Sequence, residues 1–104
     1  MSETPIELTP LELRQAEVAQ YQQNIAMYEA IAAGLPSEYP EHLVQFKGRK
    51  DQHAAIAEID DMDDVELLSD LWAHDSAKAA IRSETVEMRK AIAIMNVLQN
   101  QTTI

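Results

Sequence analysis

The chain has no cysteine, and this absence excludes disulfide bonds and any chemistry that needs a thiolate. Glycine occurs only at Gly34 and Gly48, and all four prolines lie within the first 40 residues. Strand-rich domains need turn residues roughly every 8–12 positions, yet from Arg49 to Ile104 there is neither glycine nor proline. Together with abundant alanine, leucine, glutamate and glutamine, this pattern favours helices over strands.

Long apolar segments are also missing. No stretch approaches the ~20 apolar residues that a membrane helix needs, and the N-terminal segment lacks the basic and apolar parts of a signal peptide. Because no disulfide can form, the cytoplasm is the expected compartment. The chain of 104 residues has the length of one domain.

Positive charge is scarce. Eight lysines and arginines stand against eighteen aspartates and glutamates, and the formal net charge of −10 would repel nucleic acid and anionic membranes. The acidic residues gather between residues 60 and 75, where there is no lysine or arginine, whereas residues 76–104 are mildly basic. We therefore expect a protein partner, with no direct contact to nucleic acid and none to a membrane.

The first helix has the clearest start and stop signals in the sequence. Thr9, Pro10 and Glu12 form a Thr-x-x-Glu capping box with proline at the first helical position. Gly34 is a natural C-terminal cap, and Pro36 prevents the helix from continuing. Between these signals, apolar residues recur at heptad spacing, as in a coiled coil: Leu11, Val18, Ile25 and Ala32, with Tyr21 and Tyr28 three residues after Val18 and Ile25.

Further helices are expected after residue 40. A second runs from Pro40 towards Ile59, and Gly48 in its interior costs about 1 kcal/mol relative to alanine. At this glycine either a partner helix approaches closely or the helix bends or breaks. The aspartates at 60–64 cap the start of a third helix, with Asp60 or Asp61 as the cap. Residues 62–100 form one helix or two; a second cap near His74–Ser76 favours a break there. The last segment repeats the heptad pattern with Ile81, Met88 and Met95, and with Thr85 and Ile92 four residues after the first two.

These elements predict an all-α fold, a three- or four-helix up-and-down bundle whose long first and last helices carry coiled-coil-like seams. Residues 1–8 are expected to be a flexible tail, 9–100 a single helical domain and 101–104 a frayed C-terminus. In a chain this short, the seams pair either within the monomer or across a dimer. The candidate oligomer seam consists of Val18, Tyr21, Ile25, Tyr28, Ile81, Met88, Ile92 and Met95.

Catalytic and metal-binding motifs are absent from the sequence. No two histidines have the i, i+3 or i, i+4 spacing of ligands on one helix face. If Asp61 and Asp63 began a calcium loop, Glu66 would fall where the loop needs glycine, and Trp72 where it needs a bidentate glutamate. Phosphate-binding glycine loops and serine nucleophile motifs are missing as well. We therefore expect a protein that is not an enzyme and that uses no metal and no cofactor.

Two functions fit these features. The first is a protein–protein interaction module, a homodimeric or larger regulator or assembly component. The alternative is an acidic, phage-type mimic of nucleic acid that blocks the basic groove of a DNA- or RNA-binding host protein. Trp72 is either a core anchor or a binding hot spot rimmed by charge. The candidate partner-binding residues are Asp60, Asp61, Asp63, Asp64, Glu66, Asp70, Trp72 and Asp75.

Overall fold

Two long helices dominate the computed structural model, which describes residues 8–101. They are α1 (Pro10–Ala33) and α3 (Met62–Gln101), joined through a 3₁₀ helix, η1 (Glu41–Phe46), and a short helix, α2 (Gln52–Ala57). Of the described residues, 81% are helical and none forms a strand, so the all-α prediction is confirmed. The tail expected at 1–8, apart from Leu8, and the fraying expected at 101–104, apart from Gln101, lie outside the described residues; Gln101 is the last residue of α3.

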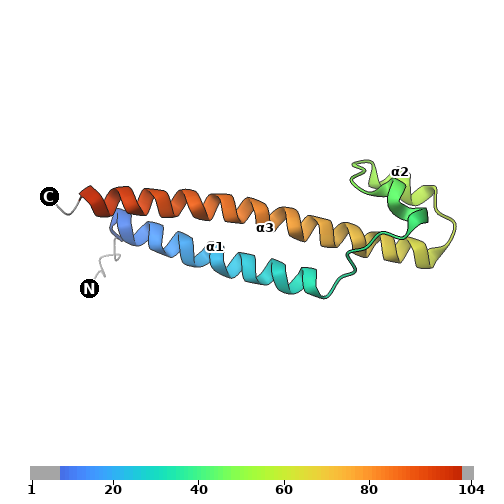
Figure 1. Ribbon diagram of the computed structural model, residues 1–104, viewed down its shortest axis with the longest axis horizontal. Helices are drawn as coiled ribbons and strands as arrows, with labels where there is room; N and C mark the ends of the chain where they lie inside the picture. The colour runs from blue at the N-terminus through green and yellow to red at the C-terminus, as the bar shows by residue number, and fades with distance from the viewer. Residues whose placement is uncertain (1–7, 102–104) are drawn as a thin grey trace, which may run out of the picture.

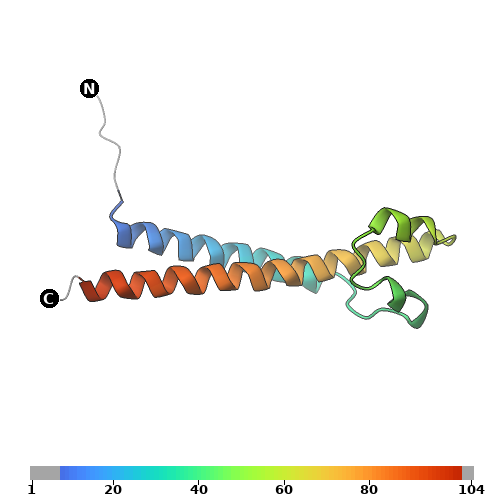
Figure 2. The ribbon, with the colours of Figure 1, turned by 90° about the horizontal axis from the view of Figure 1, so that it is seen from above.

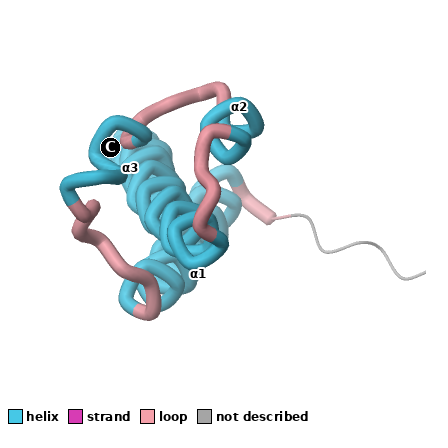
Figure 3. Tube along the Cα trace, turned by 90° about the vertical axis from the view of Figure 1, so that its right-hand side faces the viewer, coloured by secondary structure: helices cyan, strands magenta, loops and turns pink. Residues whose placement is uncertain are grey.

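The helices α1 and α3 run antiparallel and pack side by side as a helical hairpin (Figures 1 and 2). The start of α1 and the end of α3 lie together at one end. At the other end α3 extends beyond α1, and η1 and α2 lie against its first turns (Figures 1 and 3). We call residues 38–75 the cap, and residues 10–37 with 76–101 the hairpin. The molecule is elongated, with a radius of gyration of 20.8 Å against about 13 Å for a compact domain of this length.

The expected helix count of three or four is not confirmed, because only two of the helices are long. The expected second helix between Pro40 and Ile59 is replaced by η1 and α2. Gly48, which lies between them, has a φ of +75°, a left-handed conformation that ends helical geometry. The start of α3 matches the sequence better, since Asp61 Oδ1 accepts a hydrogen bond from the Asp63 backbone N–H at 2.9 Å and so caps the helix.

The break that the sequence favoured near His74–Ser76 is wrong, because α3 is continuous from Met62 to Gln101. Asp75 does not cap a new helix. Its Oδ2 instead accepts a hydrogen bond from the Tyr39 hydroxyl at 2.6 Å. A long-range contact therefore uses the carboxylate that a local cap would need.

Replacing Gly48 with alanine should destabilise the fold by about 1 kcal/mol, because a residue with a Cβ is strained at this positive φ. No atom lies within 4 Å of the added Cβ, so backbone strain is the only cost. The matched control is Gly34→Ala, where φ is −88° and the new Cβ would lie 3.7 Å from the Ile31 carbonyl oxygen. Urea unfolding should show a loss for Gly48→Ala alone; equal effects would contradict this account of the break.

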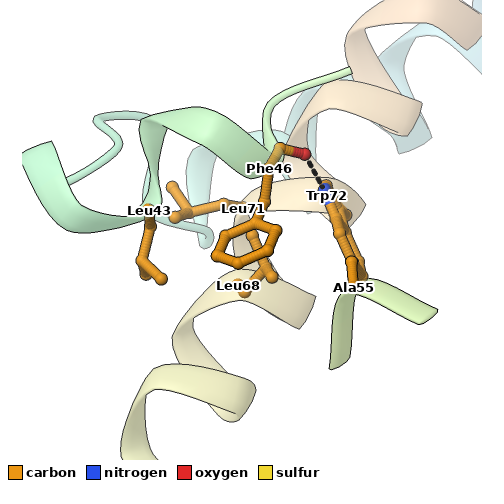
Figure 4. Close-up of a cluster of buried hydrophobic side chains, with 6 residues drawn as sticks. All are labelled: Leu43, Phe46, Ala55, Leu68, Leu71 and Trp72. Carbon is orange, nitrogen blue, oxygen red and sulfur yellow. Dashed lines mark hydrogen bonds between the residues drawn. The ribbon is translucent and has the colours of Figure 1, made fainter. Parts of the chain in front are cut away.

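The best-packed core lies in the cap, not in the hairpin. Side chains from η1, α2 and the start of α3 meet there, and the Trp72 indole N–H donates to the Phe46 carbonyl oxygen at 3.1 Å (Figure 4). The buried members of this core are Leu43, Phe46, Ala55, Leu68, Leu71 and Trp72. Along the hairpin the buried side chains are only alanines, Ala32, Ala77 and Ala91. Two helices alone therefore leave the larger seam residues partly open to solvent.

Candidate interaction surfaces

The charge of the chain is concentrated in the cap. Residues 38–75 contain eleven carboxylates and three basic side chains, which gives a net charge of −8. The hairpin contains five carboxylates and five basic side chains and is neutral. The molecule thus has an acidic end and a hairpin of zero net charge.

The predicted acidic residues all lie in the cap, but three of them have structural partners. Asp61 caps α3, Asp75 accepts from Tyr39, and Asp64 Oδ1 lies 3.0 Å from His42 Nε2. The remaining four are exposed and have no side-chain partner in the described part of the chain. These four are Asp60, Asp63, Glu66 and Asp70.

Trp72 belongs to the cap core. Its side chain is 8% exposed and its only polar atom is bonded to the Phe46 carbonyl. An open pocket of about 300 Å³ lies nearby, between η1 and the start of α3, and its lining includes Glu58, Asp60 and Asp61. Within residues 8–101, no group of three or more histidines, aspartates or glutamates is arranged to hold a metal ion. The acidic end is thus a surface of carboxylates over an apolar core.

The Tyr39–Asp75 hydrogen bond ties the loop after α1 to α3. Partial burial, the hydrogen bond and the negative charge of Asp75 raise the pKa of Tyr39 well above its ordinary value of 10.0. The folded state therefore favours the protonated phenol, and this contribution to stability is present below pH ~10 and is lost as the pH rises above it.

The Tyr39→Phe variant should lose about 1 kcal/mol of stability at neutral pH, since Asp75 loses its donor. Because the variant has no phenol at this position, its stability should also fall less steeply above pH ~10 than the stability of the natural chain. Urea unfolding at neutral and alkaline pH measures both effects. Identical pH profiles for the two proteins would contradict this role of Tyr39.

The candidate seam residues lie where α1 faces α3. Seven of the eight are half-buried, whereas Ile92 lies at the edge and is 36% exposed. Between the helices, Asn24 Nδ2 donates to Glu84 Oε2 at 3.3 Å and fixes their register. Sequence reasoning missed Ala77 and Ala91, which are buried on α3 where the helices approach closely. Ala77 and Ala91 recur at seven-residue spacing with Glu84 and Leu98, and this spacing could have indicated a buried row on α3. Because alanine occurs throughout this chain, these two alanines did not stand out.

The hairpin exposes large apolar side chains mainly on one of its two flat sides. Leu13 and Ile94 line the same groove of about 200 Å³, so these positions of α1 and α3 lie on the same side. Met27, fourteen residues after Leu13, repeats its position around α1, and the helical repeat puts Ile31 and Val97 beside Met27 and Ile94. Their exposed fractions are 39–56%. We call this surface the apolar side: Leu13, Met27, Ile31, Ile94 and Val97.

The opposite side of the hairpin is polar. On α1 this side carries the three residues that come four positions after Leu11, Val18 and Ile25. On α3 it carries three basic residues. These are Gln15, Gln22 and Glu29, and Lys78, Arg82 and Arg89. Apart from Ile92 at this edge and Val86 on the outer face of α3, the exposed large apolar residues of the hairpin lie on the apolar side. The two sides of the hairpin therefore differ in how much large apolar surface they expose.

The chain matches no protein-family model, no curated protein and no solved structure in comparisons with known proteins. Among residues 8–101, no helix is both long enough and apolar enough to cross a membrane.

Proposed function

We propose that this chain is a non-enzymatic protein–protein interaction module whose working unit is a homo-oligomer built from the hairpin, as part of a regulator or an assembly. The observation that carries the proposal is the apolar side, five large side chains exposed along a neutral two-helix shaft. Exposed large apolar side chains that gather on one side of a hairpin favour association. A second hairpin laid on it would complete a four-helix arrangement, a common stable packing for antiparallel helices.

The energetics support a dimer that depends on the whole surface. Ten side chains from two copies, each already about half buried, contribute on the order of 10 kcal/mol when covered. Association itself costs roughly 4–15 kcal/mol in lost translational and rotational freedom. The two quantities are comparable, so we expect a dimer that a few substitutions dissociate.

Light scattering during gel filtration, at low and at high salt, tests this proposal. Because apolar contacts drive the association, we expect twice the chain mass of 11.7 kDa at both salt concentrations. High salt would weaken a purely electrostatic dimer instead. A mass of 11.7 kDa under both conditions would refute the oligomer.

The charge of the cap favours a second candidate, a mimic of nucleic acid that occupies the basic groove of a DNA- or RNA-binding protein. A net charge of −8 within 38 residues is the supporting observation. Such a mimic should displace duplex DNA from a basic DNA-binding protein, and less so at high salt.

A variant in which the net charge of the cap is halved, from −8 to −4, tests the mimic without disturbing the fold. It replaces only the four carboxylates that have no partner, as Asp60→Asn, Asp63→Asn, Glu66→Gln and Asp70→Asn. Loss of DNA displacement in this variant would support the mimic. Displacement that survives the change, or that the natural chain never shows, would exclude it.

A further inference from the structure

We propose that two copies of this chain pair antiparallel across the apolar side, about a two-fold axis that passes Gln20 of α1 and the midpoint between Met88 and Arg89 of α3. This inference rests on the proposed function, because it takes a second copy as the partner. It adds which surface is covered and how the two copies are oriented. Charge, register and area each support it.

The positions of the apolar residues on α1 fit a two-fold axis at Gln20. In a two-fold interface residue i contacts residue j and j contacts i, so contacting positions lie at equal distances from the axis. On α1, Leu13 and Met27 are each seven residues from Gln20. Leu13 of one copy therefore meets Met27 of the other, and the reverse contact forms as well. Leu13 and Met27 thus cover each other across the axis.

The same relation holds independently on α3. Val97 and Ala80 are equidistant from the midpoint between Met88 and Arg89, and so are Glu87 and Lys90. Across the axis, Val97 meets Ala80, and Lys90 meets Glu87 of the second copy. Within one chain, Lys90 Nζ already lies 3.4 Å from Glu87 Oε1 on the surface. Two opposite charges beside the axis are self-complementary in this arrangement.

One axis serves both helices. Asn24 bonds Glu84 across the hairpin, and Pro10 lines one groove with Leu98, so residues at the same level have numbers that sum to 108. Gln20 is therefore level with Met88. The axis deduced from α1 and the axis deduced from α3 agree to within one residue.

Charge decides between antiparallel and parallel pairing. Parallel copies would place two caps of net charge −8 side by side. In the antiparallel pair the caps lie at opposite ends, and residue 62 of one copy is about 80 Å from residue 62 of the other at 1.5 Å per residue. This separation is many times the Debye length of about 8–10 Å, so the repulsion is screened.

The area is sufficient for a stable dimer. The 24 residues of α1 span about 36 Å, and two adjacent helices are about 20 Å across. One side of the hairpin therefore offers about 700 Å² per copy, close to the ~800 Å² per partner of a standard protein interface. In one chain the cap lies at the end of α3 that extends beyond α1 (Figures 1 and 2). In the antiparallel pair the two caps would therefore lie beyond the contact, one at each end.

A spin-label distance measurement tests the orientation. The natural chain has no cysteine, so Ser69→Cys provides a single exposed site for a nitroxide label on α3 within the cap. The antiparallel dimer predicts a distance of about 60 Å between the two labels. A dimer with labels less than ~30 Å apart would overturn the antiparallel arrangement and leave the oligomer standing. A monomer would overturn both.

A cysteine pair on α1 tests which side is covered. Gln20→Cys places thiols beside the axis, whereas the matched control Gln22→Cys places them on the polar side. Mild oxidation should cross-link the first variant into dimers far faster than the second. Faster cross-linking of Gln22→Cys would place the interface on the polar side and refute the inference.

Discussion

Replacing Leu13 and Met27 together with glutamate is expected to weaken the dimer at least 100-fold, which corresponds to about 2.7 kcal/mol. Each copy would bring two carboxylates into an apolar contact, and an unpaired charge removed from water costs several kcal/mol. Both positions are about half exposed in the single chain, so its own fold should survive. Sedimentation velocity measures the association, and circular dichroism verifies that the helices remain.

The matched control is the double variant Gln15→Glu and Gln22→Glu. It adds the same two charges to the same helix, but on the polar side of the hairpin. This variant should remain a dimer. If both double variants dissociate the dimer equally, net charge and not the apolar side controls association, and the proposed interface is wrong.

The second large effect is expected at Leu68 in the cap core. Leu68→Ala should destabilise the protein by about 3 kcal/mol, because the residue is fully buried and its removal leaves a cavity among Leu43, Phe46 and Leu71. Urea unfolding followed by fluorescence measures this loss, since Trp72 is the only tryptophan and lies in the same core.

The control for this substitution is Val86→Ala, which shortens an exposed side chain on the same helix. Its effect should stay below about 0.5 kcal/mol. Because the cap has its own core, the Trp72 signal of Leu68→Ala should be lost at lower urea than the helical signal. Coincident transitions would show that cap and hairpin unfold as one unit.

The parts of the fold that depend on local interactions were predictable from the sequence. The first helix begins with the expected capping box: Thr9 Oγ1 accepts from the Glu12 backbone at 3.2 Å, and Glu12 accepts from the Thr9 backbone at 3.1 Å. The hydrogen bond from the Thr9 backbone N–H to the Glu12 carboxylate, together with the Thr9 hydroxyl, lowers the pKa of Glu12. Residues three positions apart make both bonds, so the sequence pattern is sufficient.

The cap was not predictable in the same way. Its shape depends on Trp72 bonding to Phe46, 26 residues away, and on Tyr39 bonding to Asp75, 36 residues away. The second contact also explains why α3 runs unbroken through a possible capping residue. Local propensity carries no information about such partners.

Of the two candidate surfaces, the sequence predicted the acidic one and not the apolar one. Composition alone located the acidic cluster, because charge is visible in the sequence whatever the fold. The apolar side was missed, since Leu13, Met27 and Ile31 lie off the heptad row and a third helix of the expected bundle would have covered them. Only the two-helix architecture leaves these residues exposed.

Small-angle X-ray scattering from the natural chain in solution distinguishes an antiparallel dimer from a single chain. The dimer should give a forward-scattering mass of twice 11.7 kDa and a longest dimension of ~80 Å or more, above the 65 Å extent of one chain. A mass of 11.7 kDa with a longest dimension near 65 Å, unchanged as the protein is concentrated, would contradict it.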